Sequence, residues 1–241
     1  MKIGAAQINP IKGDIVSNIA RHQQLIELAA GEGAECIFFP ELSITGYEPE
    51  LAEDLALDVI DNRLDIFQSI SDERNMMISV GMPTKNIPRS SISMIIFRPG
   101  QSKLIYSKTF LHASEEEHFS NGADTGTVIA GTGIAPAICY EVSVPEHAEK
   151  AFANGAKLYA AGVVESRKAV EKALSRLSLI AKTYSAPTIM ANCIGLTGGY
   201  DCPGRSSAWN EKGELACQLN EMQEGVLVYD TNSGQAVARY L

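Results

Sequence analysis

Short apolar segments typical of β-strands recur along the whole chain and alternate with helical patterns. The chain has 241 residues and contains ten or more such segments, which is more than one open sheet usually holds. We therefore predict a single α/β domain over residues 1–241, with two mixed β-sheets stacked face to face and helices outside. The expected strands are 2–8, 36–39, 76–80, 92–97, 104–106, 128–129, 134–138, 158–161, 188–191, 206–209, 215–219 and 226–229. The expected helices are 14–30, one or two within 50–74, 145–154 and 170–184.

The charge and the hydropathy pattern narrow the possible partners. The formal net charge is −9, which argues against a broad basic surface for nucleic-acid phosphates or anionic lipid. No run of about 18 apolar residues exists, so no membrane span is expected. The apolar run after Lys2 is too short for a secretory signal. We expect a cytoplasmic protein that binds neither nucleic acid nor membrane.

The spacing of the cysteines and histidines predicts neither disulfide bonds nor a structural metal site. The five cysteines are an odd number without a Cys-x-x-Cys pair, and the four histidines lack the spacing of a zinc site. Neither a disulfide framework nor a metal is expected. The glycine-rich segment 195–204 is predicted to be a loop, and it has no phosphate-binding pattern before a helix. The question that remains is whether one cysteine is reactive.

Three reactive or charged residues directly follow predicted strands, where side chains gather at one edge of an α/β sheet. They are Glu41, Lys108 and Cys139. A carboxylate that takes the thiol proton and an ammonium beside a developing oxyanion suffice for acyl transfer. Each residue also has an ordinary interpretation, as a capping carboxylate, a solvated strand end or an inert buried thiol. Taken alone, these positions leave both interpretations open.

The residues around these three positions resemble a known family. The segments FPEL at 39–42, YSKTFL at 106–111 and ICYE at 138–141 are similar to the three motif blocks of the nitrilase superfamily, the carbon–nitrogen hydrolases. The resemblance spans nearly the whole chain. It implies a four-layer α-β-β-α sandwich that forms homodimers or larger homo-oligomers, without metal or organic cofactor. It also implies Glu41 as general base, Lys108 as the cation at the oxyanion and Cys139 as nucleophile.

The resemblance implies further residues at the site. A second glutamate that positions the lysine is expected four residues before Phe119, at Glu115, with Glu116 as the alternative. The expected substrate contacts are Tyr47, Tyr140 through its backbone N–H, Glu141 and Val164. Position 141 is commonly Asp in the family, and the segment 161–167 lacks the aromatic and proline residues with which many members wall the pocket.

We interpret the chain as a hydrolase that cleaves the C–N bond of a small amide or N-carbamoyl compound through an acyl-enzyme on Cys139. Nitrile hydrolysis and a glutaminase that supplies ammonia to a partner are the catalytic alternatives. A silent scaffold of the same fold is the non-enzymatic one, and the intact set of three residues argues against it. A redox-sensing thiol would need a resolving cysteine, for which Cys193 and Cys202 are the candidates.

Overall fold

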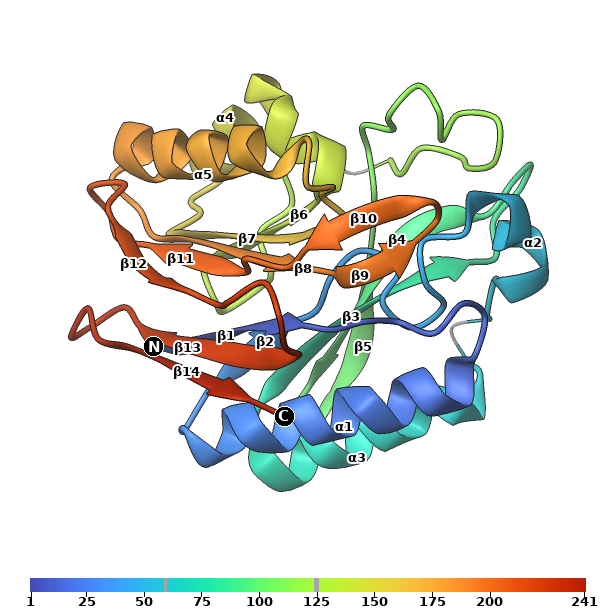
Figure 1. Ribbon diagram of the computed structural model, residues 1–241, viewed down its shortest axis with the longest axis horizontal. Coiled ribbons are helices and arrows are strands. Elements are labelled where there is room, and N and C mark those ends of the chain that lie inside the picture. The colour runs from blue at the N-terminus through green and yellow to red at the C-terminus, as the bar shows by residue number, and fades with distance from the viewer. Residues whose placement is uncertain (59, 124–125) are drawn as a thin grey trace.

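Two sheets lie face to face in the computed structural model, which describes residues 1–58, 60–123 and 126–241 (Figure 1). The larger sheet has seven strands, in the order β14 (Ala236–Tyr240), β13 (Gly225–Asp230), β1 (Lys2–Gln7), β2 (Cys36–Phe38), β3 (Met77–Thr84), β4 (Ser91–Arg98) and β5 (Gln101–Ser107). The smaller has five, in the order β12 (Leu215–Gln218), β11 (Ser207–Trp209), β8 (Thr188–Asn192), β7 (Leu158–Val163) and β6 (Ile134–Ile138).

Helices cover the outer face of each sheet, and the result is the predicted four-layer α-β-β-α sandwich (Figure 1). On the outside of the seven-stranded sheet lie α1 (Ile15–Gly31) and α3 (Asp65–Arg74), and on the outside of the five-stranded sheet lie α4 (Pro145–Ala153) and α5 (Val170–Tyr184). The remaining helical segments are short: α2 (Ala52–Leu55) and 3₁₀ helices at Pro49–Leu51, Asn62–Leu64 and Cys139–Ser143.

Three apolar cores hold the layers together. The central core fills the space between the sheets and includes Phe38 and Ile138. One outer core packs Ile26 of α1 against the larger sheet, and the other packs Leu177 of α5 against the smaller one. Strands β2 and β6 are buried along their whole length, because both faces of their sheets are covered.

Parallel pairing brings strand ends to one edge of the sandwich. Strands β1, β2 and β3 run parallel in one sheet, as do β6, β7 and β8 in the other. The chain leaves β2 toward Glu41 and leaves β6 at Cys139. Both residues are therefore delivered at carboxyl ends of parallel strands, which is where α/β folds place their binding sites.

Two local predictions are wrong. Segment 195–204 is not a loop: β9 (Ile194–Thr197) and β10 (Tyr200–Pro203) pair as an antiparallel hairpin, since Gly198 and Gly199 form its two-residue turn at φ of 54° and 77°. The predicted strand at 128–129 is reduced to a single bridge between Ile129 and Ile134. Strand β14 was not predicted at all.

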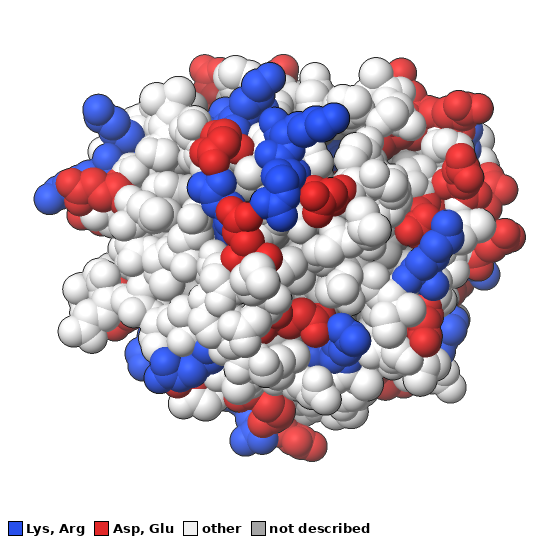
Figure 2. All heavy atoms as spheres, viewed as in Figure 1, with Lys and Arg blue, Asp and Glu red and all other residues white. Residues whose placement is uncertain are grey.

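The face of the molecule that Figure 2 shows has no broad basic region, in agreement with the expectation from the net charge. Lys and Arg side chains are interleaved there with Asp and Glu, so this face carries no broad field of one sign. None of the helices in the described ranges combines the length and apolar character needed to cross a bilayer.

Candidate active site

A buried lysine joins two buried glutamates at the edge where β2, β5 and β6 end. Lys108 Nζ donates to Oε1 of Glu41 at 2.7 Å and to the two oxygens of Glu115 at 2.8 Å each. The three residues are at most 2% exposed. Lys108 extends the β4–β5 hairpin by one more backbone hydrogen bond, from its N–H to Ile92 O at 2.8 Å, and this bond fixes where the side chain starts.

Two glycines make room for the chain at Glu41. A Cβ on Gly81 of β3 would lie 2.3 Å from Pro40 O, and one on Gly162 of β7 would lie 2.5 Å from Phe39 O. No side chain fits at such distances, so the backbone of 39–42 passes between the two sheets in direct contact with both. The close approach fixes the position of Glu41 relative to Cys139, because β7 pairs with β6 in parallel.

Cys139 occupies a strained turn between β6 and the 3₁₀ helix that it begins. Its φ is 44°, a left-handed conformation that costs a non-glycine residue about 1–2 kcal/mol. Strain of this kind is maintained only where surrounding contacts hold it, and it gathers at functional sites. The half-buried thiol points toward the segment after β7, where Sγ lies 3.8 Å from the Val164 carbonyl oxygen.

Glu141 braces this turn from inside the protein. Its carboxylate accepts from the Ile138 N–H at 2.7 Å and from the Thr109 N–H at 2.6 Å, and its side chain is fully buried. The structure corrects the prediction that Glu141 contacts the substrate, because both carboxylate oxygens are occupied by donors of the protein. Since Ile138 precedes Cys139 and Thr109 follows Lys108, one carboxylate ties the two strand ends together.

We expect Glu141→Gln to lower the free energy of unfolding by about 3 kcal/mol, because the amide turns an N–H₂ toward donors and leaves buried groups unpaired. The Tyr106 hydroxyl donates to the same carboxylate at 2.7 Å, so donors meet both oxygens and either orientation of the amide leaves some of them unpaired. Urea unfolding measures the effect, and Glu149→Gln on the exposed side of α4 is the matched control. A loss no larger than that of the control would contradict the bracing role.

Burial and charge set the protonation states of the cluster. Burial raises the pKa of Glu41 to about 7, and Lys108 opposes this rise while Glu115 adds to it. Burial disfavours the Lys108 ammonium, but Glu41, Cys139 and Glu115 outweigh it and raise the pKa of Lys108 above its ordinary value. Burial and then Glu41 raise the pKa of Cys139 well above that of a free thiol. The resting cysteine is therefore a thiol that needs a base.

Glu41 has one oxygen available for that proton. Its Oε1 is engaged by Lys108, whereas Oε2 is buried without a hydrogen-bond partner among the described residues. The Cys139 side chain is close enough to lower the pKa of the Glu41 carboxyl. An unpaired buried carboxylate oxygen beside a thiol is costly for stability and is the arrangement expected of a general base.

Glu115, and not Glu116, is the second glutamate of the cluster. Besides Lys108, Glu115 accepts from the Tyr47 hydroxyl and from the His112 N–H, both at 2.8 Å. Glu116 is exposed. Of the two glutamates that the sequence left open, the structure places Glu115 against Lys108.

The cluster opens into a cavity of about 290 Å³. Of the predicted contacts, Tyr47, Tyr140 and Val164 line it, together with Glu115 and Cys139. The remaining lining residues were not predicted as catalytic residues or substrate contacts; they are His112, Ser114, Ser143, Glu165, Ser166, Ala169, Lys172, Arg176 and Tyr200.

Two sequence signals could have identified some of these residues. Lys172 and Arg176 are four apart in a well-predicted helix, so they share a face. Tyr200 follows the Gly-Gly turn of the β9–β10 hairpin, and its ring lies 5.7 Å from that of Tyr47. The Thr197 hydroxyl of the same hairpin accepts from the Tyr47 N–H at 2.8 Å. The hairpin therefore shapes the wall that holds Tyr47.

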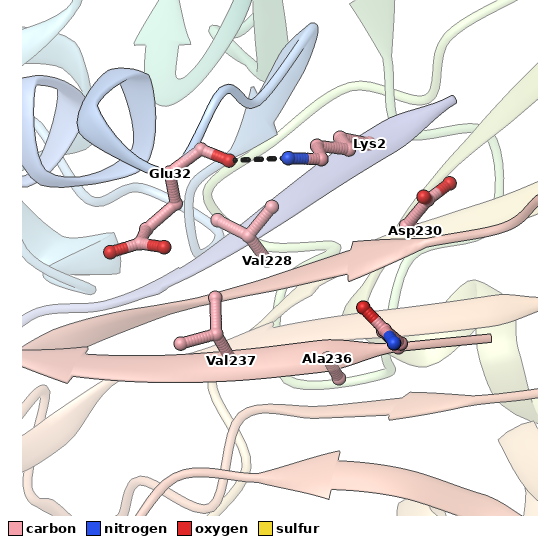
Figure 3. A pocket seen from close by; sticks show the side chains of 7 residues that line it. Lys2, Glu32, Val228, Asp230, Ala236 and Val237 are labelled. Atoms are coloured by element: carbon pink, nitrogen blue, oxygen red, sulfur yellow. Dashed lines mark hydrogen bonds between the residues drawn. The ribbon is translucent and has the colours of Figure 1, made fainter. Parts of the chain in front are cut away.

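A second hollow, of about 190 Å³, lies beside β13 and β14 (Figure 3). Lys2 and Asp230 line it, and Lys2 Nζ donates to the Glu32 carbonyl oxygen at 3.0 Å. It contains no cysteine. Within residues 1–58, 60–123 and 126–241, no cluster of three or more His, Cys, Asp or Glu side chains could hold a metal ion.

Comparison with known proteins agrees with the sequence resemblance. The sequence model named carbon–nitrogen hydrolase matches residues 2–239. The chain is 26% identical to a glutamine-dependent NAD(+) synthetase of Aquifex aeolicus over 254 aligned positions, which cover all of this chain but 44% of the synthetase. It is 30% identical to the probable hydrolase nit2 of Schizosaccharomyces pombe over 175 positions, which cover 64% of this chain and 61% of that protein.

The fold has a solved counterpart. The amidase from Nesterenkonia sp. AN1 superposes with a TM-score of 0.86 at 22% identity, over 95% of this chain and 89% of the amidase. In that structure the acetamide moiety of fluoroacetamide is covalently added at the active-site cysteine. The match over residues 2–239 decides the family. This chain belongs to the carbon–nitrogen hydrolase family.

Proposed function

We propose that the protein hydrolyses the C–N bond of a small amide through an acyl-enzyme on Cys139. The observation that carries the proposal is the unpaired, buried Oε2 of Glu41 beside the Cys139 thiol, with Lys108 held at the same carboxylate. The cavity of about 290 Å³ lies at the lower end of the usual size of ligand pockets. It therefore favours a small substrate.

In the first half of the reaction, Glu41 takes the thiol proton as Sγ attacks the carbonyl carbon. The oxyanion that forms is stabilised by the Lys108 ammonium and by the Tyr140 N–H, which belongs to the first turn of a helix and has no partner within that turn. When the C–N bond breaks, the leaving amine takes the proton from Glu41. The products of this half are a thioester on Cys139 and ammonia or an amine.

In the second half, water attacks the thioester carbon and Glu41 accepts its proton. The C–S bond then breaks, the carboxylic acid leaves, and the proton held by Glu41 returns to the sulfur. Glu115 and Tyr47 act indirectly, by positioning Lys108. Glu115 holds Lys108 through two hydrogen bonds and so keeps the ammonium at the oxyanion position. Tyr47 in turn fixes Glu115.

One observation favours an amide as the substrate over a nitrile or an N-carbamoyl compound. A cysteine-to-alanine form of the Nesterenkonia amidase, which has the same fold at 22% identity, binds butyramide. A glutaminase that supplies ammonia to a partner is the second candidate, because the Aquifex synthetase relative aligns with the full length of this chain.

Ammonia release from a panel of amides, N-carbamoyl acids, nitriles and glutamine tests the proposal. We expect amide turnover, together with an intact-mass increase equal to the acyl group that a Cys139→Ser form does not show. If no compound releases ammonia and iodoacetamide labels Cys139 no faster than Cys217, the silent scaffold is the better description.

The pH profile should report the pKa of Glu41. Because the base acts as a carboxylate and its pKa is raised to about 7, kcat/KM rises with pH through an apparent pKa near 7 instead of 4.5. Glu115→Gln removes a negative charge that raises this pKa, so the acidic limb moves to lower pH. An acidic limb with an apparent pKa near 4.5 in the unmodified protein would contradict the assignment of Glu41 as the base. A shift of this apparent pKa to higher pH in Glu115→Gln would contradict it as well.

The single domain over 1–241, the homodimer, the cytoplasmic location and the absence of a cofactor remain predictions that accompany this proposal. Apart from the substrate and water, the steps above use only groups of the chain itself.

A further inference from the structure

Two basic side chains of α5 face the same cavity as Cys139. Lys172 and Arg176 are one helical turn apart, and both line the cavity. The turn before them contributes Ala169 to the same wall. The cavity therefore runs from the proposed nucleophile, at the end of β6, to the amino-terminal half of α5.

Arg176 is held over the cavity, whereas Lys172 is free to bind a ligand. The Arg176 guanidinium donates to the Ser143 hydroxyl at 2.5 Å, and Ser143 itself lines the cavity. Lys172 is exposed, and its side-chain ammonium has no hydrogen bond or ion pair with any residue in the described parts of the chain. A free ammonium beside an oriented guanidinium is suited to a planar, doubly accepting anion.

The acidic residues of the cavity do not neutralise this pair completely. Glu115 is engaged by Lys108, Tyr47 and the His112 N–H. Glu165 is half-buried, and burial raises its pKa while Arg176 and Lys108 lower it. On the outer wall of the cavity, the Glu165 carboxylate thus faces both Lys172 and Arg176. This leaves a surplus of positive charge opposite Cys139.

We infer that the preferred substrate is a small amide that also carries a carboxylate, bound by Lys172 and Arg176 while its amide carbon lies at Cys139. The inference rests on the proposed amide hydrolysis and specifies its substrate class. The monoamide of a short dicarboxylic acid fits the 290 Å³ cavity. Its carboxylate would reach α5, and its amide would reach the end of β6.

Glutaramate and its neutral isostere 5-oxohexanamide test the inference, since they differ in the carboxylate alone. We expect kcat/KM for glutaramate to exceed that for the ketone about tenfold or more, because hydrogen bonds to charged groups are the stronger ones. Lys172→Met and Arg176→Met should each reduce this ratio, and the double variant should bring it near one. Lys168→Met, an exposed lysine nearby that does not line the cavity, should leave the ratio unchanged.

The outcomes separate the two proposals. Equal turnover of both amides, or a preference that survives in the double variant, overturns the carboxylate site and leaves amide hydrolysis standing. If neither amide is hydrolysed, calorimetric binding to the Cys139→Ala form decides the inference independently: glutaramate must bind more tightly than 5-oxohexanamide, and equal binding overturns the carboxylate site. Absence of turnover with all amides, without an adduct on Cys139, counts against the proposed function itself.

Discussion

Cys139→Ala is expected to lower kcat for amide hydrolysis at least about 10⁴-fold, because no other group replaces a covalent nucleophile. The side chain is only half-buried, lines the cavity and packs at the margin of two apolar cores, so removal of its one sulfur atom takes little from the packing. The thermal midpoint should therefore change little. Ammonia release under saturating substrate measures the first effect and calorimetry the second.

Cys217→Ala is the matched control for this substitution. Cys217 is also a free, half-buried cysteine, but it lies on β12 and does not line the cavity. Its replacement should leave kcat unchanged. Retention of more than about a hundredth of the activity by Cys139→Ala would mean that the acyl group is not carried by this sulfur.

Lys108→Met is expected to abolish turnover and also to lower the free energy of unfolding by about 3–5 kcal/mol, because removing one partner of a buried ion pair leaves uncompensated charge. Here two carboxylates, Glu41 and Glu115, lose their shared ammonium at once. Lys182→Met, an exposed lysine of α5, is the control and should change neither activity nor stability.

The pH dependence of this destabilisation has a defined sign. Lys108 lowers the pKa of Glu41, which burial has raised from 4.5 to about 7, so the variant raises that pKa further. A folded state that binds more protons than the unfolded state loses stability as the pH rises. Between about pH 4.5 and 7 both proteins lose stability in this way, whereas above about pH 7 only the variant continues to lose it, so its deficit should grow there. A deficit that instead shrinks with rising pH would show that the buried carboxylates are not the cause.

Local sequence is sufficient to predict the site residues that lie at the ends of strands. Glu41, Lys108 and Cys139 directly follow apolar strands, and a buried strand can be recognised from its own residues. The segment around each residue also resembles a family motif. For these reasons the sequence places the three residues at one edge of a two-sheet α/β sandwich before any contact between the sheets is known.

The role of Glu141 is different, because it depends on a partner segment about 30 residues away. Nothing in the ICYE segment at 138–141 indicates that its glutamate turns inward and meets the Thr109 N–H. The choice between Glu115 and Glu116 is of the same kind. One residue is buried against Lys108 and the other is exposed, and burial is a property of packing.

The sequence by itself determined the layered α/β architecture and the strand-end residues of the site, because apolar periodicity and short motifs are encoded locally. The tertiary structure decided what surrounds those residues. In the tertiary structure the glycine-rich segment forms the β9–β10 hairpin, which packs against Tyr47. Lys172 and Arg176 of α5 line the cavity. Which face of a helix or hairpin meets a pocket depends on contacts between distant segments, and those contacts form only when the two sheets stack.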